Sequence, residues 1–211
     1  DWSRMAHTVL ATTLVAAGTS ALNHYIERES DGRMRRTAAR PLPTHVLAPA
    51  EALWFGIALV LIGVLDLLRM TNTLSAVLAL ATAVMYLGIY TPLKTRTVWC
   101  TAIGAIPGAV PPLIGWAAAS GSLNAGAWIL FGILFLWQFP HFHAIAWMYR
   151  EDYGRAGILM LPVVDPEGRA TYSQILFTAA VLIPFSLLGA VVGLGGTGYF
   201  FGALVLGLLL V

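Results

Sequence analysis

Three oxygen-bearing side chains stand at the end of the first long apolar stretch, in the segment SALNHYIERESDGRMRRTAARPLP (residues 20–43). Asn23, Glu27 and Asp31 are spaced four residues apart, so on a helix each lies roughly 40° from the next and the three share one stripe about 80° wide. Carboxylate and amide oxygens are hard ligands suited to Mg²⁺. The same segment carries arginines that could grip a diphosphate bidentately: Arg35, Arg36 and Arg40. The pattern indicates a metal–diphosphate site, and the alternative is a solvated loop of ion pairs beside a membrane.

A second polar cluster follows the fifth apolar stretch, in WQFPHFHAIAWMYREDYGRAGILMLP (residues 137–162). Its candidate binding residues are Tyr149, Arg150, Glu151 and Asp152. His141 and His143 lie deeper in the stretch, and two histidines close to acids at a membrane edge favour a functional role. Their spacing of two residues puts them on different faces of a helix, so they are a poor chelating pair for one metal. The alternative is that each makes a helix–helix hydrogen bond.

A third cluster, YTPLKTR, joins the third and fourth apolar stretches. Lys94 and Arg96 could reach a diphosphate, and the ring of Tyr90 could face a developing carbocation. Alone, this segment is equally typical of an interfacial aromatic belt with a cytoplasmic anchor.

Composition places all three clusters in a membrane protein. Of 211 residues, 58% are hydrophobic and 10% are charged, whereas soluble domains carry about 25% charged residues. The net charge of +2 is too small to suggest a nucleic-acid partner, and the single cysteine, Cys100, excludes an internal disulfide framework. Both ends read as cut, so we expect a piece of a larger protein. Seven windows approach or reach bilayer length: 5–26, 47–68, 73–93, 98–118, 125–148, 172–194 and 197–211.

Basic residues follow the first, third and fifth windows, and this bias predicts the orientation in the membrane. Of the twelve lysines and arginines, only Arg4 and Arg69 fall elsewhere, so the three basic loops are expected in the cytoplasm. All three polar clusters would then meet at one membrane face, which argues for a shared binding chamber. Pro107, Pro111 and Pro112 are expected to kink or interrupt the fourth segment, which is tolerated where backbone lines a cavity.

The segment NHYIERESDGRMRRTAARPLP resembles the first acidic motif, Asn-x3-Asp-x3-Asp, of the UbiA-type intramembrane prenyltransferases. With YTPLKTRT, GAIPGAVPPLIGW and WQFPHFHAIAWMYREDYGRAGILMLPVV, it resembles the heme branch of that superfamily, the protoheme IX farnesyltransferase (heme O synthase) family. The motifs keep the family's order and span residues 23–164. Glu27 stands where the wider superfamily has Asp, and the second acidic motif is not a clean Asp-x3-Asp. Within it, Asp152 is the best candidate.

This resemblance implies an all-α polytopic transmembrane bundle, present as one truncated domain over residues 1–211 with about seven of the family's nine helices. The implied reaction transfers farnesyl from farnesyl diphosphate to a vinyl group of protoheme IX, in a bacterial inner membrane, with the active site facing the cytoplasm. A downstream heme A synthase is an implied partner. Mg²⁺ would be held by Asn23, Glu27, Asp31 and Asp152. The diphosphate charge would be neutralised by Arg35, Arg36, Arg40, Lys94 and Arg96, and His141 or His143 would contact the porphyrin.

Three other interpretations stay open at this point. Within the same fold, the acceptor could be a quinone precursor or a chlorophyllide. A cation- or proton-coupled transporter would also carry intramembrane acids, although its site is expected near the midplane and in a chain with internal symmetry. A heme-binding subunit without catalysis would need the histidines but not the acidic stripe.

Overall fold

Six helical segments of this computed structural model, which describes residues 1–210, are long and apolar enough to cross a membrane. They are α1 (Trp2–Asp31), α2 (Pro49–Met70), α3 to α4 (Thr73–Leu93), α5 with α6 (Cys100–Ser120), α7 (Ala125–Met148) and α10 (Arg169–Val191). A shorter apolar helix, α11 (Thr197–Leu210), follows, and two short helices, α8 (Arg150–Arg155) and α9 (Leu161–Val164), lie between α7 and α10. The described residues form no strand. The predicted polytopic helical bundle is confirmed, and the chain is an integral membrane protein by this measure.

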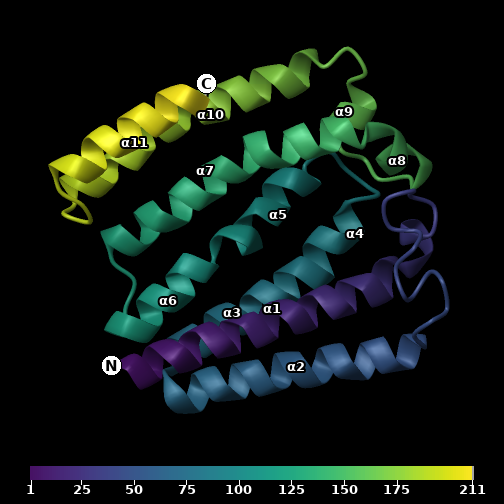
Figure 1. Cartoon of the computed structure of the whole chain (residues 1–211), viewed down its shortest axis with the longest axis horizontal. Coiled ribbons are helices and arrows are strands. Elements are labelled where there is room, and N and C mark those ends of the chain that lie inside the picture. The colour runs from purple at the N-terminus through teal and green to yellow at the C-terminus, as the bar shows by residue number, and fades with distance from the viewer. Residues whose placement is uncertain (211) are drawn as a thin grey trace.

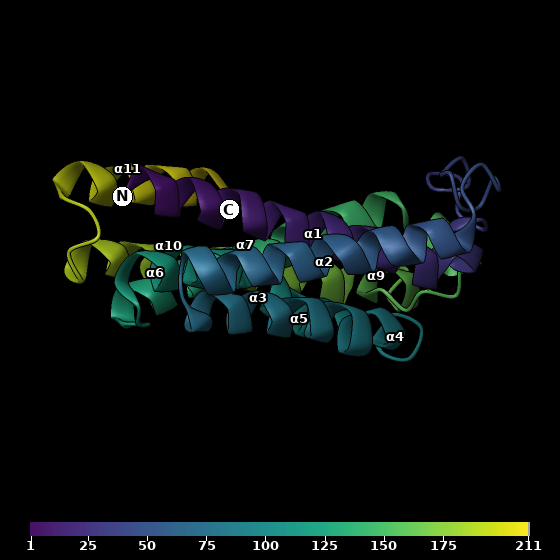
Figure 2. The same cartoon turned by 90° about the horizontal axis from the view of Figure 1, so that it is seen from below.

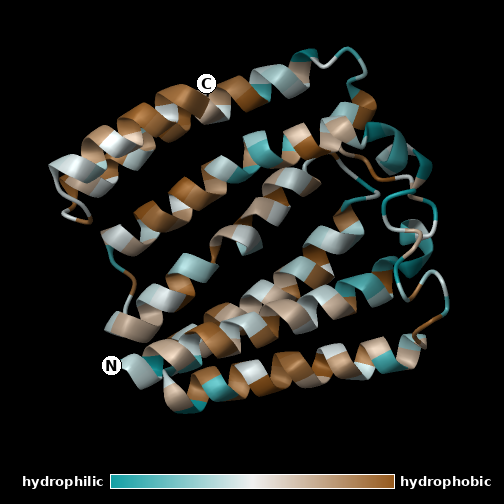
Figure 3. Ribbon diagram, viewed as in Figure 1, coloured by the Kyte–Doolittle hydropathy of each residue, from teal (hydrophilic) through white to brown (hydrophobic). Residues whose placement is uncertain are grey.

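The helices lie side by side, and three loops that are far apart in the sequence meet at one end of the bundle (Figure 1 and Figure 2). These loops follow α1, α4 and α7, and hydrophilic residues gather there while the helix bodies are mostly apolar (Figure 3). Two hydrogen bonds from backbone amides join the loops: that of Leu159 donates to the carbonyl of Lys94 (2.7 Å), and that of Arg36 donates to the side-chain oxygen Asp152 Oδ2 (3.2 Å). The predicted convergence of the three polar clusters is therefore confirmed.

Glycines let α1 and α2 pack almost backbone to backbone. A Cβ added to Gly18 would lie 2.6 Å from the carbonyl oxygen of Gly56, and one added to Gly63 would lie 2.6 Å from the carbonyl oxygen of Ala11. Contacts this close exclude any larger side chain unless the helices separate. Small residues have this role in membranes because dispersion contacts, rather than exclusion from water, hold the helices together.

Two irregularities shape the helices that face α1. The fourth span breaks at Val110 into α5 (Cys100–Ala109) and α6 (Pro111–Ser120), as the prolines predict, because Pro107 and Pro111 each lack an amide hydrogen. The third span changes at its end from α3 (Thr73–Met85) to a π-helix, η1 (Tyr86–Tyr90), followed by α4 (Thr91–Leu93). In η1 the amide of Thr91 donates to the carbonyl of Tyr86, one residue further back than in an α-helix. Such π-helical turns are frequent at functional sites.

Candidate functional site

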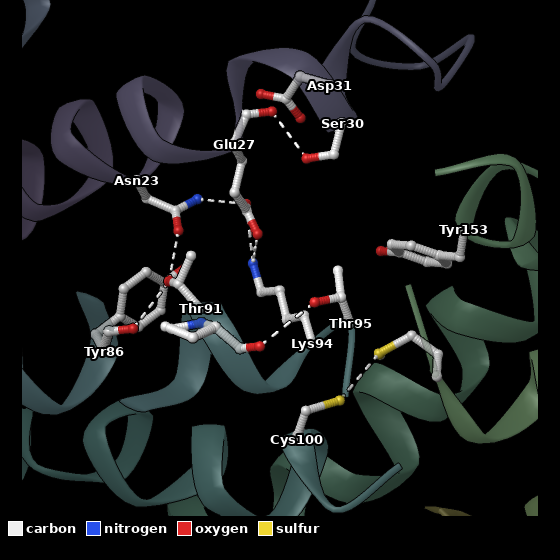
Figure 4. Close-up of polar contacts among 12 residues, drawn as sticks. Asn23, Glu27, Ser30, Asp31, Tyr86, Thr91, Lys94, Thr95, Cys100 and Tyr153 are labelled. Atoms are coloured by element: carbon white, nitrogen blue, oxygen red, sulfur yellow. Dashed lines mark hydrogen bonds and ion pairs between the residues drawn. The ribbon is translucent and has the colours of Figure 1, made fainter. Parts of the chain in front are cut away.

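The acidic stripe at the end of α1 meets α4 through a chain of short polar contacts (Figure 4). Asn23 is buried, and its Nδ2 donates to Glu27 Oε2 (2.7 Å). The hydroxyl of Thr91 lies 2.9 Å from Asn23 Oδ1 and 2.9 Å from the carbonyl oxygen of Tyr86. The π-turn therefore ties the amide of the stripe to a fixed point on the neighbouring helix.

Glu27 is paired with Lys94, the first basic residue after α4. The ammonium lies 2.8 Å from Oε1 and 3.0 Å from Oε2, and the two side chains are only 12% and 13% exposed. The same ammonium stands 4.6 Å from the ring centre of Tyr90 and 5.9 Å from that of Tyr86. One cation thus contacts a carboxylate and two aromatic faces.

Asp31 is paired in the same way with Arg40. Arg40 Nη1 donates to Asp31 Oδ2 at 2.8 Å, and the aspartate side chain is 2% exposed. Thr37 helps to fold the loop back over the helix end, because its hydroxyl donates to the carbonyl of Asp31 (2.8 Å). Both carboxylates of the stripe are therefore neutralised by a cation from a loop.

These groups line a cavity of about 330 Å³ between α1, the third span and the loop before α9. The structure brings the following predicted residues together in its wall: Asn23, Glu27, Asp31, Arg36, Arg40, Tyr90 and Lys94. Lining residues that sequence reasoning missed include His24, Tyr86, Phe142 and Tyr153. Tyr86 could have been found from its position four residues before Tyr90, on the same helical face. Burial, opposed by the nearby Arg36 guanidinium, raises the pKa of Tyr153 above its ordinary value, so its phenol is neutral at neutral pH.

Asp152 is buried but does not line this cavity. It accepts the amide hydrogen of Arg36 and forms an ion pair with Arg155, three residues away. The Arg36 guanidinium also stands over the rings of Tyr149 (5.2 Å) and Tyr153 (5.9 Å). Asp152 therefore docks the loop after α1 onto α8. In residues 1–210, no three His, Cys, Asp or Glu side chains lie together as a preformed metal cluster.

The remaining predicted residues lie outside the cavity wall. Four are exposed at the polar end of the bundle: Arg35, Arg96, Arg150 and Glu151. Of these, Arg150 covers the ring of Trp147 at 4.7 Å. Their assignment to substrate binding stays a prediction.

The two histidines of α7 face different surroundings, as their spacing predicts. His141 is exposed and stacks on Trp137, with ring centres 4.6 Å apart. His143 is buried and donates from Nε2 to Gln174 Oε1 on α10 (2.7 Å). It lines a separate cavity of about 410 Å³ between α5, α7 and α10. The proposed contact of either histidine with a porphyrin therefore has no support from the acidic cavity and stays a prediction.

The chemistry of the acidic cavity follows from its walls. Carboxylates, an amide and cations share one end of the cavity, which suits a polyvalent anion with its counter-ion. Aromatic faces of Tyr86 and Tyr90 stand beside them, and such faces attract positive charge. The combination suits a reaction that separates an anionic leaving group from a carbocation.

Comparison with known proteins gives a consistent family. A family model described as the UbiA prenyltransferase family matches residues 1–211. A protoheme IX farnesyltransferase of Solibacter usitatus is 55% identical over 208 residues, which cover 99% of this chain and 71% of that protein. Proteins with the same name from Koribacter versatilis and Salinibacter ruber are 51% and 48% identical, covering 100% and 99% of this chain and 67% and 74% of their own lengths. No solved structure matches the chain significantly.

Proposed function

This chain belongs to the UbiA prenyltransferase family, and we propose that it transfers a farnesyl group from farnesyl diphosphate to a vinyl group of protoheme IX. The products are heme O and diphosphate. The observation that carries the proposal is identity of 41–55% over nearly the whole chain to proteins named protoheme IX farnesyltransferase. The cavity at the end of α1 supplies the chemistry that such a transfer needs.

The diphosphate would be held by the cations that now neutralise the acidic stripe. Lys94 and Arg40 each contact a carboxylate at 2.8 Å, and Arg36 lines the same cavity. A diphosphate in this space would compete with Glu27 and Asp31 for these cations. Arginine and lysine bind phosphate oxygens strongly where water is excluded, so the exchange would fix the leaving group against the polar end of the bundle.

The same exchange would free the stripe to hold Mg²⁺. The donor set fits the ion, because Asn23 Oδ1 and the carboxylates of Glu27 and Asp31 are hard oxygen ligands on one cavity wall. When bound, Mg²⁺ would supply positive charge that stabilises the departing diphosphate. Asp152 would join this set only by leaving Arg155 and the amide of Arg36, so we assign the metal to the first three residues.

Breaking the bond between the farnesyl C1 and the diphosphate oxygen leaves the electron pair on the diphosphate and positive charge on the allylic carbons. The faces of Tyr86 and Tyr90 stand where they can stabilise that charge, since each already accepts the Lys94 ammonium. The vinyl π electrons of protoheme then form the new carbon–carbon bond. Water adds to the resulting cation and loses one proton, which completes the hydroxyethylfarnesyl group.

The orientation follows from charge. The polar end holds the basic loops after α1, α4 and α7, so we place it at the cytoplasmic face of a bacterial inner membrane. The cavity lies at this end of the helices rather than midway along them, which disfavours a transport site.

An acceptor assay tests the proposal. The protein, reconstituted in lipid nanodiscs, is supplied with farnesyl diphosphate, Mg²⁺ and an equimolar mixture of protoheme IX and an aromatic quinone precursor. We expect only the heme to gain the mass of one farnesyl group and one hydroxyl. Prenylation of the quinone precursor instead would agree with the family assignment but would refute protoheme IX as the acceptor.

A further inference from the structure

One histidine in the wall of the acidic cavity has no role in the chemistry described so far. His24 lines the cavity, is half-buried, and makes no side-chain hydrogen bond or ion pair with any of residues 1–210. The amide of Asn23 and the carboxylates of Glu27 and Asp31, on the same helix, are all engaged by hydrogen bonds or ion pairs. His24 can therefore bind a ligand without breaking a contact of the folded chain.

His24 lies on a different side of α1 from the contact with α4. Asn23 Oδ1 marks that contact, at 2.9 Å from the hydroxyl of Thr91, and the next residue of a helix is turned by about 100°. α1 packs mainly against α2, α6 and α3, whereas α7 contributes Phe142 and Ile145 to the same cavity. The cavity therefore lies between the helix that carries His24 and α7.

The side chains from α7 and from the loop before α9 are apolar where they line this space. They are Phe142, Ile145, Ile158 and Met160. Such a wall suits the face of a flat conjugated ring better than it suits an ion. Mg²⁺ prefers oxygen ligands, so it does not need the imidazole, whereas imidazole suits iron and holds the haem iron of globins and peroxidases. A free imidazole beside an apolar wall thus matches an iron porphyrin.

The position of His24 along α1 also suits an acceptor. It stands three residues before Glu27, which is about 4.5 Å along the helix axis. The vinyl groups of protoheme are on the rim of the macrocycle, one ring radius from the iron. An iron held at His24 would therefore leave a vinyl group within reach of the Glu27–Lys94 pair and the faces of Tyr86 and Tyr90, where the diphosphate is proposed to leave.

We propose that the imidazole of His24 ligates the iron of the protoheme acceptor and so selects an iron porphyrin over acceptors without iron. The inference rests on the proposed function, because it takes protoheme IX as the acceptor that enters the acidic cavity. No bond of the substrate breaks at His24, which binds the macrocycle and orients its vinyl edge. The iron contact is thereby given to a histidine of α1 rather than to His141 or His143 of α7.

Resonance Raman spectroscopy of bound ferrous protoheme tests the ligand directly. Tag-free protein in nanodiscs is compared with empty nanodiscs, and we expect an iron–histidine stretching band in the wild type that is absent in His24→Gln. Glutamine keeps a hydrogen-bonding amide but supplies no imidazole. Losing an outer-sphere partner of a metal ligand already costs about 10–100-fold in affinity, so losing the ligand itself should weaken heme binding by at least about tenfold.

Two controls separate iron ligation from a structural effect. Metal-free protoporphyrin IX has the same shape without the iron, so its affinity should be the same in His24→Gln and the wild type, which also shows that the variant is folded. His45→Asn removes an exposed histidine from the loop after α1, at a backbone φ of 58° that asparagine tolerates. This variant should keep the Raman band and the heme affinity of the wild type.

A band that persists in His24→Gln, or that His141→Ala or His143→Ala removes while His24→Gln keeps it, would overturn the inference. So would a wild type without an iron–histidine band. Farnesylated heme is measured in the same samples by mass spectrometry. Farnesyl transfer with heme affinity unchanged in His24→Gln would refute the ligand and leave the proposed function supported. A band that depends on His24 in a protein that alkylates no heme would refute the proposed function and leave the ligand supported.

Discussion

Replacing Lys94 by methionine should change the affinities for metal and for diphosphate in opposite directions. In the structure the Lys94 ammonium makes two contacts with Glu27, at 2.8 Å and 3.0 Å, from a position only 12% exposed. A hydrogen bond to a charged group contributes about 1.5–3 kcal/mol, and each 1.4 kcal/mol is about a tenfold change in affinity. Without this competing cation, Glu27 should bind Mn²⁺ roughly ten- to a hundredfold more tightly in the absence of diphosphate.

The same substitution removes a cation from the diphosphate site. Inorganic diphosphate should therefore bind Lys94→Met roughly tenfold or more weakly than the wild type, because one charge-assisted hydrogen bond is lost. In the wild type, diphosphate should raise the affinity for Mn²⁺, because it draws Lys94 and Arg40 away from Glu27 and Asp31. Mn²⁺ should likewise raise the affinity for diphosphate, because it occupies the carboxylates and releases the two cations.

The assay is electron paramagnetic resonance of free Mn²⁺, titrated with protein in nanodiscs with and without inorganic diphosphate. Arg33→Met is the matched control, because it removes one exposed cation from the same end of the bundle. It should leave both affinities near wild type. Mn²⁺ binding that is unaffected by diphosphate in the wild type, or weakened in Lys94→Met, would refute the exchange of ion pairs.

Three further substitutions probe how the site is held. Thr91→Val removes the hydroxyl that lies 2.9 Å from Asn23 Oδ1. Because an unpaired buried polar group costs about 1–3 kcal/mol, we expect kcat/KM to fall by about tenfold. An unchanged kcat/KM in steady-state kinetics would contradict this role of Thr91. Gly104→Ala places a Cβ 2.5 Å from the Tyr90 ring. Such overpacking costs about 1–3 kcal/mol of stability, so we expect a lower melting temperature and slower turnover. An unchanged melting temperature would argue against this contact. Burial raises the pKa of Tyr153, so this phenol stays protonated as the pH rises through the ordinary tyrosine pKa of about 10. Tyr153→Phe should therefore keep the wild-type pH–rate profile across neutral pH. A shift of the alkaline limb of that profile in Tyr153→Phe would contradict a neutral phenol.

Helical periodicity made the first motif predictable. Asn23, Glu27 and Asp31 repeat every four residues, and on a long helix such a repeat places the three side chains on one face. The charge bias of the loops likewise predicted that three distant clusters meet at one end. These features depend on local geometry and on membrane topology, which the order of residues determines directly.

Other features depend on contacts between segments and could not be read from residue order. Thr91 contacts both Asn23 and the carbonyl of Tyr86 at the end of a π-turn, and no residue type announces such a turn. Asp152 was predicted to join the metal site; in the structure its oxygens contact Arg155 and the amide of Arg36, and its role as a metal ligand stays a prediction. Which acid pairs with which cation is decided by how the loops fold over the helix ends.

If diphosphate leaves from the cavity beside Asp31, loss of this carboxylate should abolish the reaction, whereas loss of a comparable acid elsewhere should not. Asp66 is a useful control, since it is also a paired acid within a span, 3.1 Å from His7 at the opposite end of α1. Farnesylated heme is measured by mass spectrometry for the wild type, Asp31→Ala and Asp66→Ala, each in nanodiscs with farnesyl diphosphate, protoheme IX and Mg²⁺. We expect Asp31→Ala to form no product and Asp66→Ala to keep most of its activity. Full activity in Asp31→Ala would contradict it.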